Sequence, residues 1–227
     1  YNRRMFRQAE TNVLKAIEFD AANSRHYFLA GQTYEQLGVN EKARKVYNQS
    51  VLLDETRWDA RYRLGFLLAE NREYEEAISQ LETAVSLGQD ADARRLLVQV
   101  KALYYLESGN KNFDAGKYRE AVDDYDRALK MEKSRTALIN KANALIALGE
   151  PEPAIAILKG LVSEKEKFLP AWETLALAYE KAGNTAEAEA THAAIEAMSK
   201  NDWNSYFSSG TFYHQNRAWA RAIASYR

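Results

Sequence analysis

The sequence has no cysteine, and it has only 3 prolines and 10 glycines among 227 residues. Without cysteine it can form no disulfide framework, zinc–thiolate site or cysteine nucleophile. The missing thiols leave the compartment open, with the cytoplasm as the default and the periplasm as an alternative. The net charge is −1, from 31 basic and 32 acidic side chains. This balance argues against nucleic acid or an anionic membrane as the partner, since both require a basic surface.

Long apolar runs are absent as well. No stretch approaches the roughly 20 apolar residues that cross a bilayer, so we expect no direct membrane insertion. The first residues, Tyr1 to Arg4, do not resemble a signal peptide. The chain stops at Arg227 within a helical pattern, and both ends look cut. We therefore expect a part of a longer polypeptide.

The sequence does contain an internal repeat. A small alanine recurs in a similar local context, at Ala9, Ala43, Ala77, Ala121, Ala154, Ala188 and Ala222. The successive intervals are 34, 34, 44, 33, 34 and 34 residues. Further marked residues stand three, four or seven positions apart, which places them on one face of a helix. Each unit therefore predicts a pair of helices.

Glycine occurs at two kinds of position in this repeat. One kind lies between the two helices, where a left-handed backbone is expected, at Gly38, Gly116, Gly149 and Gly183. The second unit has no glycine there, and we expect Asn71 to take this role. The other kind should allow close contact between helices, at Gly31, Gly65, Gly109 and Gly210.

The pattern resembles the tetratricopeptide repeat family, whose 34-residue unit reads W-x2-L-G-x2-Y…A-x3-F. Here the first complete unit reads Tyr27-x2-Ala30-Gly31-x2-Tyr34, followed by Ala43-x3-Tyr47. The resemblance implies an all-α fold, a right-handed superhelical solenoid of antiparallel helix pairs that forms a single domain over residues 1–227. Its expected parts are a leading second helix at 4–22, repeats at 24–57, 58–91, 102–134, 135–168 and 169–202, and a truncated repeat at 203–227.

The interval of 44 residues leaves an extension at residues 92–101. Residues 91–109 contain no helix breaker before Gly109, so they predict one lengthened helix. We expect Leu96, Leu97 and Val100 to cover the neighbouring repeat. The alternative is a protruding surface that binds a partner.

Catalytic chemistry finds no support in the sequence, and we expect neither an enzyme nor a cofactor or metal site. His26, His192 and His214 fall in different repeats without metal-ligand spacing, and His192 takes an aromatic packing position that predicts a core residue. No glycine-rich phosphate loop occurs. The acidic residues Asp123, Asp124 and Asp126 are expected on a solvated helix face.

In the family that the chain resembles, the first helix of each pair lines a concave groove. The resemblance nominates the residues Tyr62, Phe66, Leu106, Asn110, Phe113, Ile139, Asn143 and Ile146 as a central groove that binds a peptide or protein segment. Contiguous exposed apolar surface usually marks an interaction site. Asn110 and Asn143 could bond the backbone of an extended peptide. The alternative is that curvature or another segment covers these residues.

One known subclass of the family holds the C-terminal carboxylate of chaperones with lysine, arginine and asparagine. Asn110 and Asn140 match its asparagines, but Leu106, Pro170 and Thr174 replace its cations. A carboxylate would lose its charge-assisted bonds, so we do not expect chaperone-tail binding. The sequence predicts a non-catalytic protein-interaction scaffold. Two alternatives are self-association through the solenoid ends and an accessory domain of a larger enzyme or complex subunit.

Overall fold

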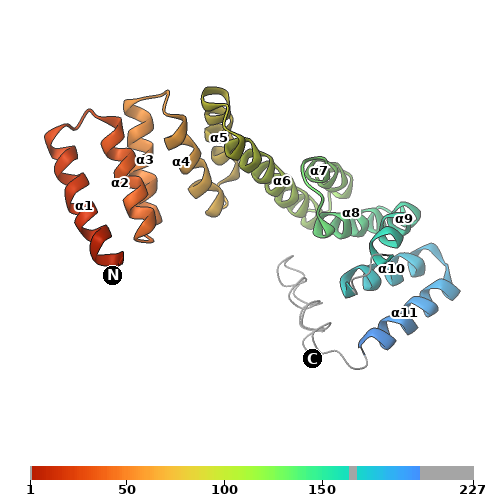
Figure 1. Ribbon diagram of the computed structural model, residues 1–227. Helices are drawn as coiled ribbons and strands as arrows, with labels where there is room; N and C mark the ends of the chain where they lie inside the picture. The colour runs from red at the N-terminus through yellow and green to blue at the C-terminus, as the bar shows by residue number, and fades with distance from the viewer. Residues whose placement is uncertain (1, 164–167, 200–227) are drawn as a thin grey trace. The chain divides into compact units, whose positions relative to one another are not determined.

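The computed structural model describes residues 2–163 and 168–199 of the chain. Within these ranges all regular structure is α-helical, as the sequence predicts (Figure 1). The helices are α1 (Asn2–Phe19), α2 (Ser24–Gln36), α3 (Asn40–Leu53), α4 (Trp58–Glu70), α5 (Tyr74–Gly88), α6 (Ala91–Asp114), α7 (Tyr118–Met131), α8 (Arg135–Ala147), α9 (Pro151–Val162), α10 (Leu169–Ala182) and α11 (Thr185–Ser199). The predicted Gly210, His214 and Ala222 lie outside the described residues.

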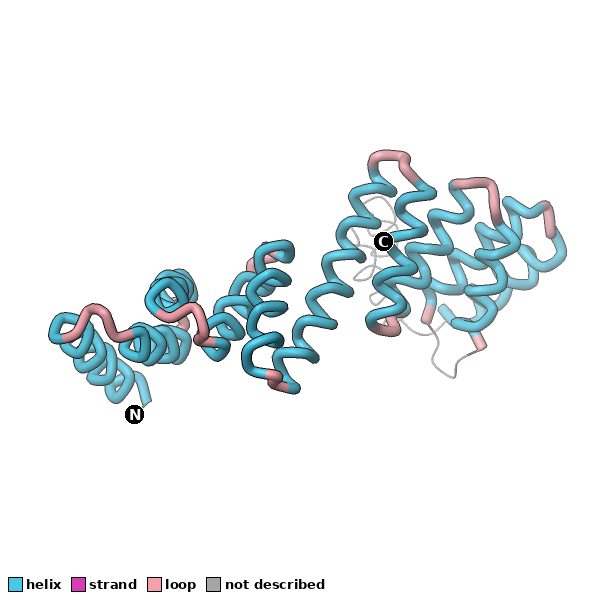
Figure 2. Tube along the Cα trace, turned by 90° about the horizontal axis from the view of Figure 1, so that it is seen from above, coloured by secondary structure: helices cyan, strands magenta, loops and turns pink. Residues whose placement is uncertain are grey.

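The chain divides into two compact units, Tyr1–Tyr104 and Tyr105–Arg227. In unit 1, α2 packs on α3 and α4 packs on α5, with α1 against α2. In unit 2, α9 packs on both α8 and α10, and α10 packs on α11. Figure 2 shows that short loops join the successive helices from α1 to α9.

Each unit has its own apolar core. The fully buried side chains of unit 1 include Tyr47, Leu68 and Leu81, and those of unit 2 include Tyr125, Ile139 and Leu158. Small residues lie between these large ones, which lets neighbouring helices approach closely. A single helix pair could not bury this much apolar surface, so stacking stabilises both units.

Glycine turns between paired helices are confirmed. Gly38, Gly116, Gly149 and Gly183 all have φ between +73° and +79°. The prediction for the second unit was wrong by one residue, because Asn71 has φ −87° whereas Arg72 has φ +62°. Arg72 lies five residues before Ala77, and each turn glycine lies five residues before the corresponding alanine. A non-glycine residue therefore occupies the left-handed position there.

The predicted close contacts at glycine are also confirmed for the described residues. A Cβ atom on Gly31 would overlap the ring of Tyr47, and one on Gly109 would lie 2.6 Å from the ring of Tyr125. At Gly65 the nearest atom would be Leu81 Cγ at 2.7 Å. These glycines thus provide the space into which the second helix of each pair inserts a large side chain.

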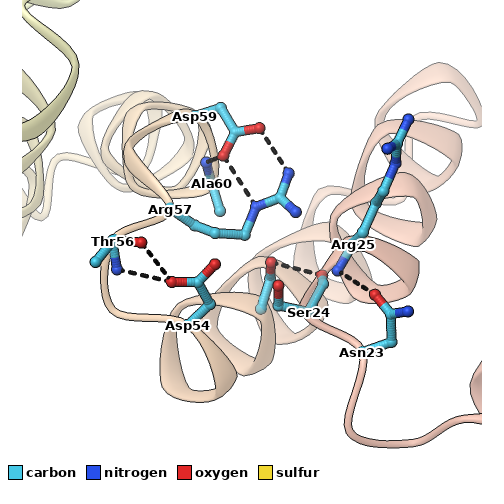
Figure 3. Close-up of polar contacts among 9 residues, drawn as sticks. Asn23, Ser24, Arg25, Asp54, Thr56, Arg57, Asp59 and Ala60 are labelled. Carbon is cyan, nitrogen blue, oxygen red and sulfur yellow. Dashed lines mark hydrogen bonds and ion pairs between the residues drawn. The ribbon is translucent and has the colours of Figure 1, made fainter.

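Aspartates close two of the turns that lead into the first helix of a pair. Asp54 Oδ1 accepts hydrogen bonds from the backbone N–H of Thr56 at 3.0 Å and from its hydroxyl at 2.7 Å (Figure 3). Asp20, 34 residues earlier, accepts the backbone N–H of Ala22 at 3.2 Å. Such aspartate turns define the chain reversal through bonds to the backbone two residues further on.

The long helix predicted around residues 91–109 is α6, which runs for 24 residues. Val100 is buried in the core of unit 1, and Leu96 and Leu97 pack against that core. Lys101 adds an ion pair with Glu82 of α5 at 2.7 Å. The expectation that this segment covers the neighbouring repeat is therefore confirmed.

Candidate functional site

The residues predicted to line a groove lie on the first helix of successive pairs. In unit 1, Tyr62 and Phe66 lie on α4, half-buried against the core. In unit 2, α6 carries Leu106, Asn110 and Phe113, and α8 carries Ile139, Asn143 and Ile146. The predicted residues therefore fall on two surfaces, one in each unit.

The two isoleucines of α8 are core residues. Ile139 is 0% exposed and Ile146 is 9% exposed, and both belong to the apolar core of unit 2. Helix α8 packs on α7, α9 and α10, so few of its positions remain open. We expected these two isoleucines to form part of an exposed apolar patch, but other helices of the chain cover them. At these two residues the alternative, coverage by another segment, is therefore correct.

The apolar residues of α6 keep part of their surface. Leu106 and Phe113 are half-buried and pack against the same core. The Phe113 ring contacts the Tyr118 ring of α7, with a centroid distance of 5.3 Å and a tilt of 59°. This aromatic contact fixes the orientation of Phe113 at the edge of the core.

Three helices of unit 2 meet at the side chain of Asn110. The Tyr125 hydroxyl of α7 donates to Asn110 Oδ1 at 2.9 Å, and Asn140 Nδ2 of α8 donates to the same oxygen at 2.9 Å. We call Asn110, Tyr125 and Asn140 the Asn110 cluster. A carbonyl oxygen has two lone pairs, so these two bonds use its accepting capacity.

The other polar atom of Asn110 faces solvent. Asn110 Nδ2 makes no hydrogen bond within the described part of the chain. No buried side-chain nitrogen or oxygen among the described residues lacks a partner, so this nitrogen is not buried. Asn143 lies one turn beyond Asn140 on α8, and its side chain likewise makes no hydrogen bond to the described residues. Both polar atoms of this side chain are open to solvent.

Unit 1 contains a related cluster whose centre takes another place in the repeat, since Glu35 stands four residues after Gly31 whereas Asn110 directly follows Gly109. The Tyr47 hydroxyl of α3 donates to Glu35 Oε2 of α2 at 2.7 Å, and Arg63 Nη2 of α4 donates to the same oxygen at 2.6 Å. We call Glu35, Tyr47 and Arg63 the Glu35 cluster. Its central residue is a carboxylate, which only accepts hydrogen bonds.

The tyrosines of the two clusters have strongly raised pKa values. Burial is the main cause of the raised pKa of Tyr47, and the bonded Glu35 carboxylate adds to it. Burial also dominates the raised pKa of Tyr125, and the charges of Asp114 and Asp124 raise it further. Both hydroxyls therefore stay protonated and serve as donors.

The buried Asp124 corrects one prediction from the sequence. It was expected on a solvated face but is only 7% exposed, on the side of α7 that faces α6. Its Oδ2 accepts hydrogen bonds from the Ser108 hydroxyl at 2.7 Å and from Asn112 Nδ2 at 2.9 Å. Both donors lie on α6, more than ten residues away, so the helical pattern around Asp124 gave no sign of them.

The exposed His192 corrects a second prediction from the sequence, which placed it in the core. Its side chain is 56% exposed, and its Nε2 lies 2.8 Å from Glu180 Oε1 of α10. The equivalent positions in other pairs hold the buried Tyr47 and Tyr125. Among the described residues, no group of three or more His, Cys, Asp or Glu side chains is placed to hold a metal ion.

Two tetratricopeptide repeat models match the chain, over residues 28–94 and 112–176, which together make up more than half of it. The chain belongs to the tetratricopeptide repeat family. A crystal structure of the C-terminal part of a tetratricopeptide repeat-containing protein from Cytophaga hutchinsonii has the same fold, with a TM-score of 0.54. It is 13% identical and covers 99% of this chain and 89% of that chain.

Two curated proteins of the fission yeast Schizosaccharomyces pombe are similar in sequence. The DnaJ homolog subfamily C member 7 homolog is 24% identical over 160 residues, covering 67% of this chain and 34% of the relative. Anaphase-promoting complex subunit 3 is 24% identical over 155 residues, covering 68% of this chain and 22% of the relative. The chain thus spans about a third or less of the length of these relatives.

Membership in the tetratricopeptide repeat family has a general functional meaning. Such proteins are generally non-catalytic scaffolds that bind other proteins, and one relative of this chain is by name a complex subunit. The all-α solenoid fold of this chain is therefore that of a protein-interaction scaffold. No helix among the described residues is long and apolar enough to span a bilayer.

Sequence reasoning missed the roles of Tyr125 and Asn140 in the candidate site. A usable signal was the glycine–tyrosine pair, because Gly31 with Tyr47 and Gly109 with Tyr125 have the same 16-residue separation. The residues on the following first helix, Arg63 and Asn140, also take equivalent places in their repeats. That recurrence points to a repeated hydrogen-bond cluster.

Proposed function

We propose that this chain captures an extended segment of a protein partner along the first helices of its repeats. In unit 2 the contact surface consists of Leu106, Asn110, Phe113 and Asn143. The observation that carries the proposal is the open Asn110 Nδ2 and the open Asn143 side chain beside half-buried apolar residues. Apolar surface with a few oriented polar groups suits a bound peptide.

Ile139 and Ile146 have a supporting role in this proposal. They fill the core of unit 2 behind the surface and hold α8 against its neighbours. In unit 1, Tyr62 and Phe66 form a separate half-buried surface on α4, where the Arg63 guanidinium lies 5.6 Å from the centre of the Phe66 ring. That surface is a candidate contact of its own for a partner segment.

A peptide selected from a random 12-residue library against the purified protein provides the probe. We expect Phe113→Ala to weaken its binding at least tenfold, because a buried aromatic anchor contributes about 1.4 kcal/mol or more. Met131→Ala is the matched control, since Met131 is an exposed apolar residue on the second helix α7. Titration calorimetry measures both variants, and circular dichroism checks their helicity. Equal affinity of the Phe113→Ala variant and the wild type would rule this surface out.

Self-association is a second candidate, favoured by the apolar side chains of α1. Phe19 is 93% exposed, and Met5 and Leu14 are also exposed. An open stack that leaves apolar surface at one end can join another copy. Light scattering should show a mass that rises with concentration and falls in the Phe19→Asp variant. A monomer at all concentrations would exclude self-association.

The third candidate is an accessory domain of a larger enzyme or complex subunit. It agrees with the small part of the relatives' length that the chain covers. The sequence of the whole gene distinguishes it from the first two.

A further inference from the structure

Two of the first helices end on a carboxylate. Glu70 is the last residue of α4, and Asp114 is the last residue of α6. The free carbonyl groups at the C-terminal end of a helix carry a partial negative charge, so this end favours lysine or arginine and disfavours an acid. Both helices therefore carry a negative side chain where their own backbone is already negative.

No cation of the described chain offsets these two carboxylates. Both side chains are exposed, and neither makes an ion pair or a hydrogen bond within residues 2–163 and 168–199. Arg72 and Lys117 lie in the turns that follow the two helices, but they form no ion pair with them. The conflict between each carboxylate and its helix end is thus left unrelieved.

The other described first helices show no such conflict. Glu70 and Asp114 each stand two residues before the left-handed residue of the turn. At the same position α2 has Gln36, α8 has Ala147 and α10 has Lys181, none of which is acidic. Departures from a local rule that no contact within the chain offsets are expected at functional sites.

Each carboxylate shares a helix face with residues of a proposed partner surface. Residues at intervals of four lie on one face of a helix. The set on α4 is Tyr62, Phe66 and Glu70, and the set on α6 is Leu106, Asn110 and Asp114. The Tyr125 hydroxyl bonds to Asn110, and after burial the charge of Asp114 is the next cause of the raised pKa of Tyr125. The field of Asp114 therefore reaches the surface of unit 2.

We propose that each surface binds a partner segment in which a lysine or arginine stands beside the apolar anchor, and that this cation contacts Glu70 in unit 1 or Asp114 in unit 2. This inference rests on the proposed peptide-binding function. The cation meets a carboxylate and the negative end of a helix at the same place.

The cations next to these helix faces are already paired. Arg63 follows Tyr62 in the sequence and pairs with Glu35 at 2.6 Å. Lys111 follows Asn110 and pairs with Glu107 at 3.1 Å. The unpaired charge at the end of each face is therefore negative, which complements a basic segment and opposes an acidic one.

Two pools of 12-residue peptides with blocked ends test the preferred charge. Both pools contain the same apolar and neutral residues, but one has lysine and arginine as its only charged residues and the other has aspartate and glutamate. We expect the immobilised protein to retain the basic pool about fivefold better at low salt, and about 0.5 M NaCl should remove most of this preference by screening. Equal retention, or better retention of the acidic pool, would overturn the inference.

The tightest peptides of the basic pool then test the two carboxylates by titration calorimetry. A peptide whose binding depends on Phe113 should bind Asp114→Asn about five- to tenfold more weakly than the wild type. A peptide whose binding depends on Phe66 should respond in the same way to Glu70→Gln. The phenylalanine thus identifies the surface, and the carboxylate on the same helix is tested with it.

Matched controls remove an exposed carboxylate from the second helix of the same pair. Asp123→Asn in α7 and Glu76→Gln in α5 make the same chemical change and should alter the affinity less than twofold. Asp114→Asn removes a charge that opposes the helix dipole, so its melting temperature should equal or exceed that of the wild type. Weaker binding by this variant then does not result from unfolding.

Reversal of the charge on both partners gives a further test. Asp114→Lys should bind the basic peptide more weakly than Asp114→Asn does. It should regain affinity at least threefold when the lysines and arginines of the peptide are replaced by glutamate. The wild type should show the opposite order for the two peptides, and the same order in both proteins would contradict a direct contact.

The outcomes separate this inference from the proposed function. Binding of the basic peptides that is insensitive to both Phe66→Ala and Phe113→Ala contradicts the proposed surfaces. Binding that depends on one phenylalanine but not on the carboxylate of the same helix leaves the surface in place and contradicts the cation site. Retention of neither pool contradicts both.

Discussion

Arg72 and the turn glycines adopt the same left-handed backbone, but arginine carries a Cβ atom that this conformation disfavours. Four of the five described turns between paired helices avoid the conflict by using glycine. The turn between α4 and α5 forms nevertheless, because the helices on either side pack through Leu68 and Leu81. The packing of the helices thus overrides a local preference at one residue.

The Arg72→Gly substitution should therefore stabilise unit 1. We expect the free energy of unfolding to rise by about 1 kcal/mol, the usual order of the left-handed penalty. Gly116→Ala is the matched control and should lower it by about 1 kcal/mol, because no atom lies within 4 Å of the added Cβ and only backbone strain changes. Urea unfolding measures the free energy of unfolding of both variants and of the wild type. A loss of stability in Arg72→Gly would contradict the interpretation.

Glu73 links the two helix pairs of unit 1 through its carboxylate. It accepts bonds from Arg44 Nη1 at 2.8 Å and Nη2 at 3.0 Å, and from Asn71 Nδ2 at 2.6 Å. The bond from Asn71, followed by that from Arg44, lowers the pKa of Glu73 below its ordinary value of 4.5. A lowered pKa in the folded state means that the unfolded state takes up the proton first as the pH falls.

Stability due to Glu73 should therefore be fully present above pH 4.5 and be lost as the pH falls through the lower pKa of the folded state. Glu73→Gln removes this titration, so its melting temperature should fall less steeply below pH 4.5 than that of the wild type. Melting followed by circular dichroism between pH 3 and pH 7 makes the comparison. Parallel curves would show that Glu73 does not contribute.

At the scale of the helix, the meaning of a glycine depends on what its neighbours place against it. Gly160 lies within α9, and a Cβ atom there would have no neighbour within 4 Å. Gly109 lies within α6, where the same atom would meet the Tyr125 ring at 2.6 Å. The sequence pattern distinguished these two cases, since only Gly109 recurs at a repeat position.

The same substitution should consequently have opposite effects in the two helices. Gly160→Ala should raise the free energy of unfolding by about 0.5–1 kcal/mol through the lower conformational entropy of the unfolded chain. Gly109→Ala should lower it by about 1–3 kcal/mol, because the buried Tyr125 ring must move. Chemical denaturation of the two variants tests the difference. Equal effects would contradict the packing role of Gly109.

Helix-level features were predictable because they depend on residues close in sequence. The paired helices follow from spacings of three, four and seven, and the four turn glycines follow from their fixed distance to the repeated alanines. Asp124 and Ile139 were not predictable in this way, since their burial depends on α6, α9 and α10 rather than on their own helices. For the candidate site, the pattern identified Asn110 but not the partners that orient it.

At the scale of the whole chain, the two apolar cores are the main determinant of stability. Leu68 belongs to the core of unit 1 and Leu158 to the core of unit 2, and both are fully buried. In repeat proteins each element depends chiefly on its nearest neighbours. Damage to one core should therefore be felt first by the helices of the same unit.

Hydrogen exchange measured by mass spectrometry can test this division. Leu68→Ala should cost about 2–5 kcal/mol locally and speed amide exchange in α2–α5, with α8–α10 almost unchanged. Leu158→Ala should produce the reverse pattern. Faster exchange throughout the described helices in both variants would show that the chain unfolds as one cooperative body.

The hydrogen bonds of Asn110 also bear on how the protein ages. Asparagine slowly loses its side-chain amide when the following backbone nitrogen attacks the side-chain carbonyl carbon, and the product is aspartate or its isomer. A helical backbone hinders this attack at both Asn110 and Asn143, and two bonds to Oδ1 hold the Asn110 amide in place as well. Asn143 lacks such bonds, so in a stored sample it should lose its amide sooner than Asn110. The older the preparation, the larger the share of its molecules that carry a negative charge at position 143, while the amide of Asn110 persists.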